Sequence, residues 1–533
     1  MRVLEVGSAD DDRVRLVETN NMMPGKYTAL SYCWGKEASL RTETENVEDM
    51  KAGIAFKDLP SVYRDAVALT RELGVKYIWI DALCIIQDSH SDWERECSMM
   101  AETYANAYLT IAAASSASVT DHFLRPALKP PPHAAQEQRV IHSETMQSKN
   151  GPVLLKARAM WPTGAHWKWQ DSADQQPHIE PLTKRGWTLQ EKVLSTRLLS
   201  ISAMEMTWTC KEKIACECGS RLNYHRELGQ TPLSQISKPE EAFNFWHKVV
   251  ENYSKRRLTQ IADKLPAISA IAAIIQQRIG SQYVAGLWTD NIDLDLLWRR
   301  PGLSRVAAAN SPYIAPSFSW ASIKGEVDYL CFRNGQIPYE KSSEVLEVSS
   351  VSGPDAPLGR VSSSRLVIRG PLAMGYIERK PRHWISRRLG TRRLWFCVDL
   401  GKTQLWFYPD TALSKTVSVS DGAPESSACR WSRAQNGQDL LQELERLDQK
   451  QPIGDAHHQA EGREDSSGIR CWVMRLGTFH LRNGKMDHEY LILGKSPSQP
   501  DSFERIGLGM MMSDDDEADR MFAPASTATI TIV

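Results

Sequence analysis

The run Tyr77-Ile78-Trp79-Ile80-Asp81 decides the fold class of this chain. Its four apolar residues, with no polar residue between them, suit a strand that is buried on both faces, as in a parallel sheet. The acidic residue that follows ends the strand and begins a loop. Ligands of open α/β sheets bind beyond the carboxyl ends of the strands, so Asp81 stands where a functional carboxylate would lie.

The segments on both sides continue an alternation of strands and helices. Tyr27–Tyr32 and Leu109–Ala112 are strand-like. A helix is predicted over residues 60–73, because Pro60 suits a first turn and apolar residues recur at helical spacing up to Gly74. A second helix is predicted from Ser91-Asp92-Trp93-Glu94, which has the spacing of a capping box. Strand, helix, strand, helix, strand favours an α/β unit with a parallel sheet.

Composition changes predict three parts in the chain. Residues 1–220 form the α/β core, with a proline-rich surface insertion at about 126–180. Residues 221–326 form a helical extension. Residues 327–533 form a smaller β-rich region, in which the polar stretch of about 411–466 is expected to be mobile. The strand-like runs of this last part are Arg365–Arg369, Leu394–Val398, Leu405–Tyr408, Cys471–Arg475 and Tyr490–Leu493. The dipeptide Asn483-Gly484 predicts a hairpin turn.

Charge and composition exclude several classes of protein. The chain has 533 residues, 42% of them hydrophobic, and 64 Lys or Arg against 65 Asp or Glu. Without a basic excess, nucleic acid is not an expected partner. No apolar run is long enough to span a bilayer, and residues 1–6 do not open a secretory signal. The ten scattered cysteines favour a reduced, cytoplasmic protein. Cys210, Cys216 and Cys218 match no usual zinc spacing, so no metal is expected.

Three sequence blocks carry a resemblance to a known family. Residues 27–35 look like Y-x-A-L-S-Y-x-W-G, residues 78–88 are similar to W-I-D-x-L-C-I-x-Q, and residues 185–197 look like R-x-W-x-L-Q-E-x-x-L-S-x-R. In these blocks and their order, the chain resembles fungal heterokaryon-incompatibility (HET-domain) proteins over roughly residues 1–325. It departs from the pattern at Ile86, where many members carry Asn.

The resemblance implies a fold and two alternative mechanisms. HET domains are held to be distantly similar to TIR domains, so a flavodoxin-like core is expected, with a role in non-self recognition and programmed cell death. Some TIR domains hydrolyse NAD, which would make NAD a substrate here and not a bound cofactor. Other TIR domains catalyse no reaction and act only by assembling. The alternative is therefore a non-catalytic module that self-associates or binds a protein partner.

Three carboxylates are candidates for catalysis by analogy with TIR chemistry. Asp81 either faces a ligand or caps the amides of its own turn. Glu96 either stabilises an oxocarbenium-like ribose as nicotinamide leaves or is an ordinary exposed helix residue. Glu191 either acts in catalysis or completes a capping box with Thr188.

Five further residues are candidates for binding the substrate. Trp34 and Gly35 follow a strand and suit the floor of a pocket, although tryptophan is more often plain core. Arg185 suits a phosphate, or an acidic partner within the fold. Ser31 belongs to the first sequence block, and Gln87 lies in the same loop as Asp81.

Overall fold

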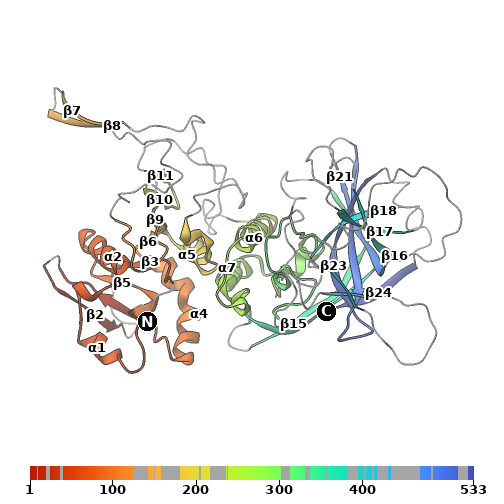
Figure 1. Ribbon diagram of the computed structural model, residues 1–533, viewed down its shortest axis with the longest axis horizontal. Helices are drawn as coiled ribbons and strands as arrows, with labels where there is room; N and C mark the ends of the chain where they lie inside the picture. The colour runs from red at the N-terminus through yellow and green to blue at the C-terminus, as the bar shows by residue number, and fades with distance from the viewer. Residues whose placement is uncertain are drawn as a thin grey trace, which may run out of the picture. The chain divides into compact units, whose positions relative to one another are not determined.

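The chain is described by a computed structural model with two compact units, Met1–Gln235 and Ile236–Val533 (Figure 1). The structure describes residues 1–8, 10–19, 25–35, 40–124, 142–148, 151–157, 180–202, 206–216, 236, 238–301, 313–329, 337–353, 357–381, 394–400, 404–410, 413–416, 430–433, 469–481, 484–513 and 526–533.

Four parallel strands form the centre of the sheet in the first unit. In spatial order they are β5 (Tyr77–Trp79), β3 (Tyr27–Ser31), β6 (Leu109–Ala113) and β9 (Arg197–Ile201). Antiparallel strands extend both edges: β1 (Arg2–Glu5), β2 (Arg13–Glu18) and β4 (Ile54–Ala55) beyond β5, and β10 (Met206–Cys210) and β11 (Ile214–Cys216) beyond β9. The sheet is therefore mixed, and the expectation of a parallel sheet holds for its centre. Short connections join β1 to β2, β9 to β10 and β10 to β11, and these pairs are antiparallel because a short connection cannot return a chain in the parallel direction.

Helices cover both faces of this sheet. On β3, the Thr28 hydroxyl lies 2.7 Å from that of Thr70 in α2 (Ser61–Glu72). On β5, the ring of Trp79 meets that of Tyr104 in α4 (His90–Asn106), with centroids 5.6 Å apart. Trp79 is in register with Ala29, the neighbour of Thr28, and successive side chains of a strand point to opposite faces. The two helices thus pack on opposite faces, and Figure 1 shows them on either side of β5.

Three shorter helices and a hairpin complete the first unit: α1 (Val47–Ala52), α3 (Asp81–Cys84), α5 (Trp187–Leu194), and β7 (His142–Ser148) paired with β8 (Gly151–Ala157). The hairpin belongs to the expected insertion, most of which lies outside the described residues.

The predicted start of the second helix at Ser91 is wrong. α4 begins at His90, and Ser89 is its N-cap, with a side chain that accepts a hydrogen bond from the Asp92 amide at 3.4 Å. The capping box of Ser91 and Glu94 does not form, because the helix already begins before Ser91.

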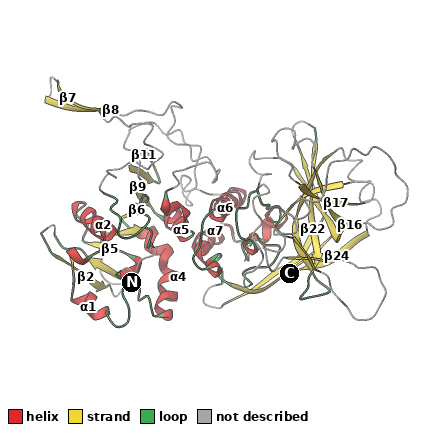
Figure 2. Cartoon of the chain, in the orientation of Figure 1, coloured by secondary structure: helices red, strands yellow, loops and turns green. Residues whose placement is uncertain are grey.

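The second unit opens with helices and continues as strands (Figure 2). Its helices are α6 (Pro239–Ser254), α7 (Ser269–Ile279) and α8 (Ile292–Asp295), beside the two-stranded pair β12 (Tyr283–Val284) and β13 (Leu287–Trp288). Both α6 and α7 lie within residues 221–326, where the sequence predicts helices. Between them, short 3-10 turns around Pro266 interrupt the pattern.

The β-rich prediction for the last part of the chain is confirmed. The described strands of the larger sheet are β14 (Tyr339–Lys341), β15 (Glu344–Ser352), β16 (Val361–Pro381), β17 (Leu394–Asp399), β18 (Gln404–Pro409), β21 (Ile469–His480), β22 (Met486–Lys495), β23 (Phe503–Ser513) and β24 (Ser526–Ile532). A separate pair joins β19 (Leu413–Thr416) to β20 (Arg430–Arg433). All five predicted runs fall inside strands. β21 and β22 form the predicted hairpin, with Gly484 at φ 77°, while Asn483 lies outside the described residues.

The stretch of about 411–466 also lies mostly outside the described residues. Within the part of the chain that is described, no helix has both the length and the apolar character needed to cross a bilayer.

Candidate functional site

Asp81 is held by donors from two strand ends. It follows β5 as the first residue of α3. The indole Nε1 of Trp34, beyond the end of β3, donates to Asp81 Oδ2 at 2.9 Å, and the Ala82 amide donates to Oδ1 at 2.7 Å. The carboxylate both caps its own turn and receives a side chain from the neighbouring strand, and the residue is half-buried. The two alternatives for Asp81, cap and functional group, are therefore compatible.

Tyr32 lies beside this carboxylate, and Arg185 contacts the backbone of Tyr32. Arg185 Nη1 donates to the Tyr32 carbonyl at 2.6 Å, which brings the third sequence block onto the end of β3. The Tyr32 hydroxyl lies 2.8 Å from that of Tyr63 on α2. Burial and the nearby Asp81 charge hold the pKa of Tyr32 well above its usual value, so this phenol stays protonated.

Glu191 is a buried carboxyl group in the same region. Only 7% of the residue is exposed, and burial raises the pKa of Glu191 to about 7. Hydrogen bonds from Ser31 and Tyr104 and the charge of Arg185 lower this pKa, while the charge of Asp81 raises it further. Glu191 and Asp81 thus act on each other electrostatically, and a group with a pKa near 7 can exchange a proton at neutral pH.

The capping-box interpretation of Glu191 is wrong. α5 begins at Trp187, so Thr188 lies inside the helix. Its hydroxyl donates to the carbonyls of Leu182 at 2.7 Å and Arg185 at 2.9 Å. The hydroxyl of Thr188 therefore closes the turn before α5.

Gly35 is required by close packing. It has a φ of 83°, and a Cβ built there would lie 2.5 Å from Ser118 Oγ. This glycine packs the segment after β3 against the residues that follow β6.

Gln87 contacts the backbone of its own loop. Its side-chain amide donates to the carbonyls of Asp81 at 3.0 Å and Ile85 at 3.1 Å. Asp81 Oδ1 and Oδ2, by contrast, accept from Ala82 and Trp34. In this structure Gln87 therefore shapes the loop that carries Asp81.

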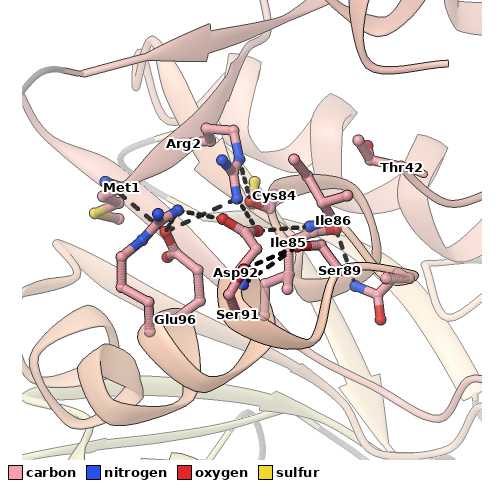
Figure 3. A network of polar contacts seen from close by, with 12 residues as sticks. Met1, Arg2, Thr42, Cys84, Ile85, Ile86, Ser89, Ser91, Asp92 and Glu96 are labelled. Atoms are coloured by element: carbon pink, nitrogen blue, oxygen red, sulfur yellow. Dashed lines mark hydrogen bonds and ion pairs between the residues drawn. The ribbon is translucent and has the colours of Figure 1, made fainter. Parts of the chain in front are cut away.

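Glu96 belongs to a different cluster, and it is not an exposed helix glutamate (Figure 3). Its exposure is 1%, and its Oε1 lies 3.9 Å from an Arg2 nitrogen and 3.4 Å from an Arg95 nitrogen. The structure thus places Asp81 and Glu191 near enough for their charges to influence each other, and it places Glu96 in an ion cluster with two arginines.

Sequence reasoning missed two groups in this part of the molecule. Arg2 occupies a buried position in a strand that reads as ordinary, and its one signal is a charge among the apolar residues of β1. Thr42 lies in a segment without periodicity, yet its hydroxyl donates to the Leu83 carbonyl at 2.7 Å.

A cavity of about 260 Å³ lies at the other ends of the parallel strands, where β3 and β5 begin. It is lined by Tyr27 and Tyr77, the first residues of these two strands, and by Glu102 and Asn106 of α4. The three candidate carboxylates do not line this cavity.

These features define a mixed α/β domain with a half-buried carboxylate, Asp81, just beyond the end of a central parallel strand. Residues 27–191 match the family model of the heterokaryon incompatibility protein (HET), so this segment of the chain is a HET domain. Neither the curated proteins nor the solved structures contain a match to the chain.

The raised pKa of Glu191 predicts that the first unit loses stability as the pH rises. The pKa of this carboxyl is 4.5 in the usual case and about 7 in the fold. Between these values the unfolded chain gives up its proton first, so stability present below pH 4.5 is lost by about pH 7. The loss is at most roughly 3 kcal/mol.

Glu191→Gln mimics the protonated group, so the variant should lack this part of the pH dependence. Urea unfolding at pH 5 and pH 8 measures it, with the exposed Glu94→Gln as the matched control. Equal pH dependence in wild type and Glu191→Gln would contradict the prediction.

Proposed function

We propose that this chain is an effector of heterokaryon incompatibility, and that its HET domain kills by hydrolysing the N-glycosidic bond of NAD or a related nucleotide. The family match supports the biological role. One observation carries the mechanism: a half-buried carboxylate, Asp81, shares its surroundings with a buried carboxyl of raised pKa, Glu191, and with the guanidinium of Arg185.

The chemistry needs these groups in different roles. When the bond between ribose and nicotinamide breaks, nicotinamide leaves with the electron pair and positive charge develops on the ribose. The Asp81 carboxylate stabilises that charge. A water molecule then forms the new bond to the ribose carbon and loses a proton, which Glu191 accepts because its pKa lies near 7. Arg185 provides positive charge for the pyrophosphate.

The strand order favours a TIR-like, flavodoxin-like core. Numbered by their order in the chain, the parallel strands β5, β3, β6 and β9 run 2-1-3-4 across the sheet. This is the start of the flavodoxin order, in which ligands bind at the strand ends where the order reverses. The end of β3, with Ser31 and Trp34, lies at that reversal.

Incubating the purified protein with NAD and measuring free nicotinamide tests the mechanism. We expect wild type to release nicotinamide, and Glu191→Gln to reduce the release by roughly 10²-fold or more, the usual range for an acid–base group. Glu94→Gln, an exposed change on α4, is the control. A chain that kills cells while leaving NAD intact would instead indicate the interaction module.

A further inference from the structure

Arg2 lies outside the segment matched by the HET family model, yet it contacts the loop that carries Asp81. It is the first residue of β1 and is 7% exposed. Its Nε donates to the Cys84 carbonyl at 2.8 Å, and its Nη2 pairs with the Asp92 carboxylate (Figure 3). One planar guanidinium thus joins the end of α3 to the first turn of α4.

Asp92 extends this connection to the next part of the loop. The residue is 5% exposed, and its Oδ2 accepts the Ile86 amide at 2.9 Å. Arg2 and Asp92 therefore satisfy the carbonyl of residue 84 and the amide of residue 86. Because both partners are charged and buried, these hydrogen bonds belong to the stronger class.

Neutral hydrogen bonds fasten the rest of the loop. The Thr42 amide donates to the Ala82 carbonyl at 2.9 Å, and the Gln87 amide donates to the Thr42 carbonyl at 2.8 Å. The Ile85 amide donates to the Asp81 carbonyl at 3.1 Å. The backbone that follows Asp81 is therefore fixed from several sides, and Arg2 with Asp92 supplies its buried charged contact.

We propose that Arg2 and Asp92 are positioning residues for the candidate site, and that their ion pair fixes residues 84–86 and through them the orientation of Asp81. The inference rests on the proposed function for its catalytic consequence only. Its structural part, the fixing of the loop, is independent of any substrate.

Electrostatic balance explains why the pair is sensitive to substitution. Asp92 and Glu96 are buried carboxylates, and Arg2 and Arg95 are the arginines beside them. Removing the Arg2 charge leaves two buried carboxylates with less compensation, which is costly in a low dielectric. Lysine would keep the charge but lacks the planar fork that contacts Cys84 and Asp92 together.

Hydrogen exchange of residues 81–88 tests the inference without NAD. Arg2→Lys and Arg2→Gln should speed exchange of the Ile86 amide by roughly tenfold or more, the loss expected for one charge-assisted hydrogen bond. Both should lower nicotinamide release through kcat more than through KM. Arg71→Gln is the matched control, because Arg71 Nε makes the same kind of bond, at 2.7 Å, to the Val6 carbonyl beyond the other end of β1.

The outcomes separate the two proposals. If Arg2→Lys keeps wild-type exchange at Ile86, the planar fork that joins Cys84 to Asp92 does not fix the loop, and the positioning role is overturned. A loosened loop with unchanged nicotinamide release also overturns it. If wild type releases no nicotinamide, the proposed chemistry fails, and loss of cell killing in Arg2→Lys, but not in Arg71→Gln, then decides the positioning role. Should Arg2→Gln not fold, Arg2→Lys alone carries the comparison.

Discussion

Replacing Asp81 with asparagine should reduce nicotinamide release by about 10²-fold or more while leaving the first unit folded. The proposed reaction develops positive charge on the ribose, and a neutral amide cannot stabilise that charge as a carboxylate does. Asparagine has one acceptor oxygen, so it can serve either Trp34 Nε1 or the Ala82 amide, which both donate to the carboxylate. The stability cost is therefore about one hydrogen bond, ~1 kcal/mol.

Asp88→Asn is the matched control for this substitution. Asp88 lies at the end of the same loop, is exposed, and accepts hydrogen bonds from the Thr44 amide at 2.9 Å and from its hydroxyl at 3.0 Å. Its replacement should leave nicotinamide release and cell killing unchanged. A folded Asp81→Asn protein as lethal as wild type would remove Asp81 from the mechanism and favour the interaction module.

Breaking the buried ion pair of the second unit should be the most destabilising single change that we consider. Arg505 and Asp410 are both 0% exposed, and Arg505 Nε donates to Asp410 Oδ2 at 2.8 Å. The same guanidinium donates to the Leu296 carbonyl at 2.6 Å and lies 3.6 Å from the ring centroid of Trp298. Asp410→Ala leaves this cation buried without its partner, which costs roughly 3–5 kcal/mol.

Denaturant unfolding of the second unit measures this effect. Glu347→Ala is the control, because it breaks an exposed pair with Arg365, 3.0 Å across in the same sheet. An exposed pair contributes about 0–1 kcal/mol. If Asp410→Ala costs no more than Glu347→Ala, the buried pair does not stabilise the unit.

Local patterns predicted most elements of the fold. The buried run before Asp81, the apolar stripe of α2 and the short runs in β17, β18 and β22 each contain enough periodic or continuous apolar sequence to identify an element. The runs Arg2–Val6 and Val14–Val17 predict β1 and β2, but the pairing of β1 with β5 was not predicted. Pairing depends on partners such as β1 and β5, which lie about 70 residues apart in the sequence.

The candidate site was harder to predict than the fold. The position of Asp81 follows from the rule on strand ends, and the structure brings Trp34 and Arg185 to the same end. The burial of Glu96 and the role of Arg2 depend on charges that meet only in three dimensions. A charged residue is usually expected at the surface, and the neighbouring sequence does not show that an oppositely charged residue of another element lies beside it in the fold.

The pairing of β16 with β24 has a consequence for synthesis of the chain. Leu366 pairs with Ile532, so one side of β16 stays without this partner until the later strand leaves the ribosome. At typical elongation rates the delay is roughly 10–30 s. The first unit is a continuous segment, Met1–Gln235, and can fold before then. During the delay the nascent chain exposes unpaired backbone on β16, so this is the period when chaperone binding protects it most from association with other chains.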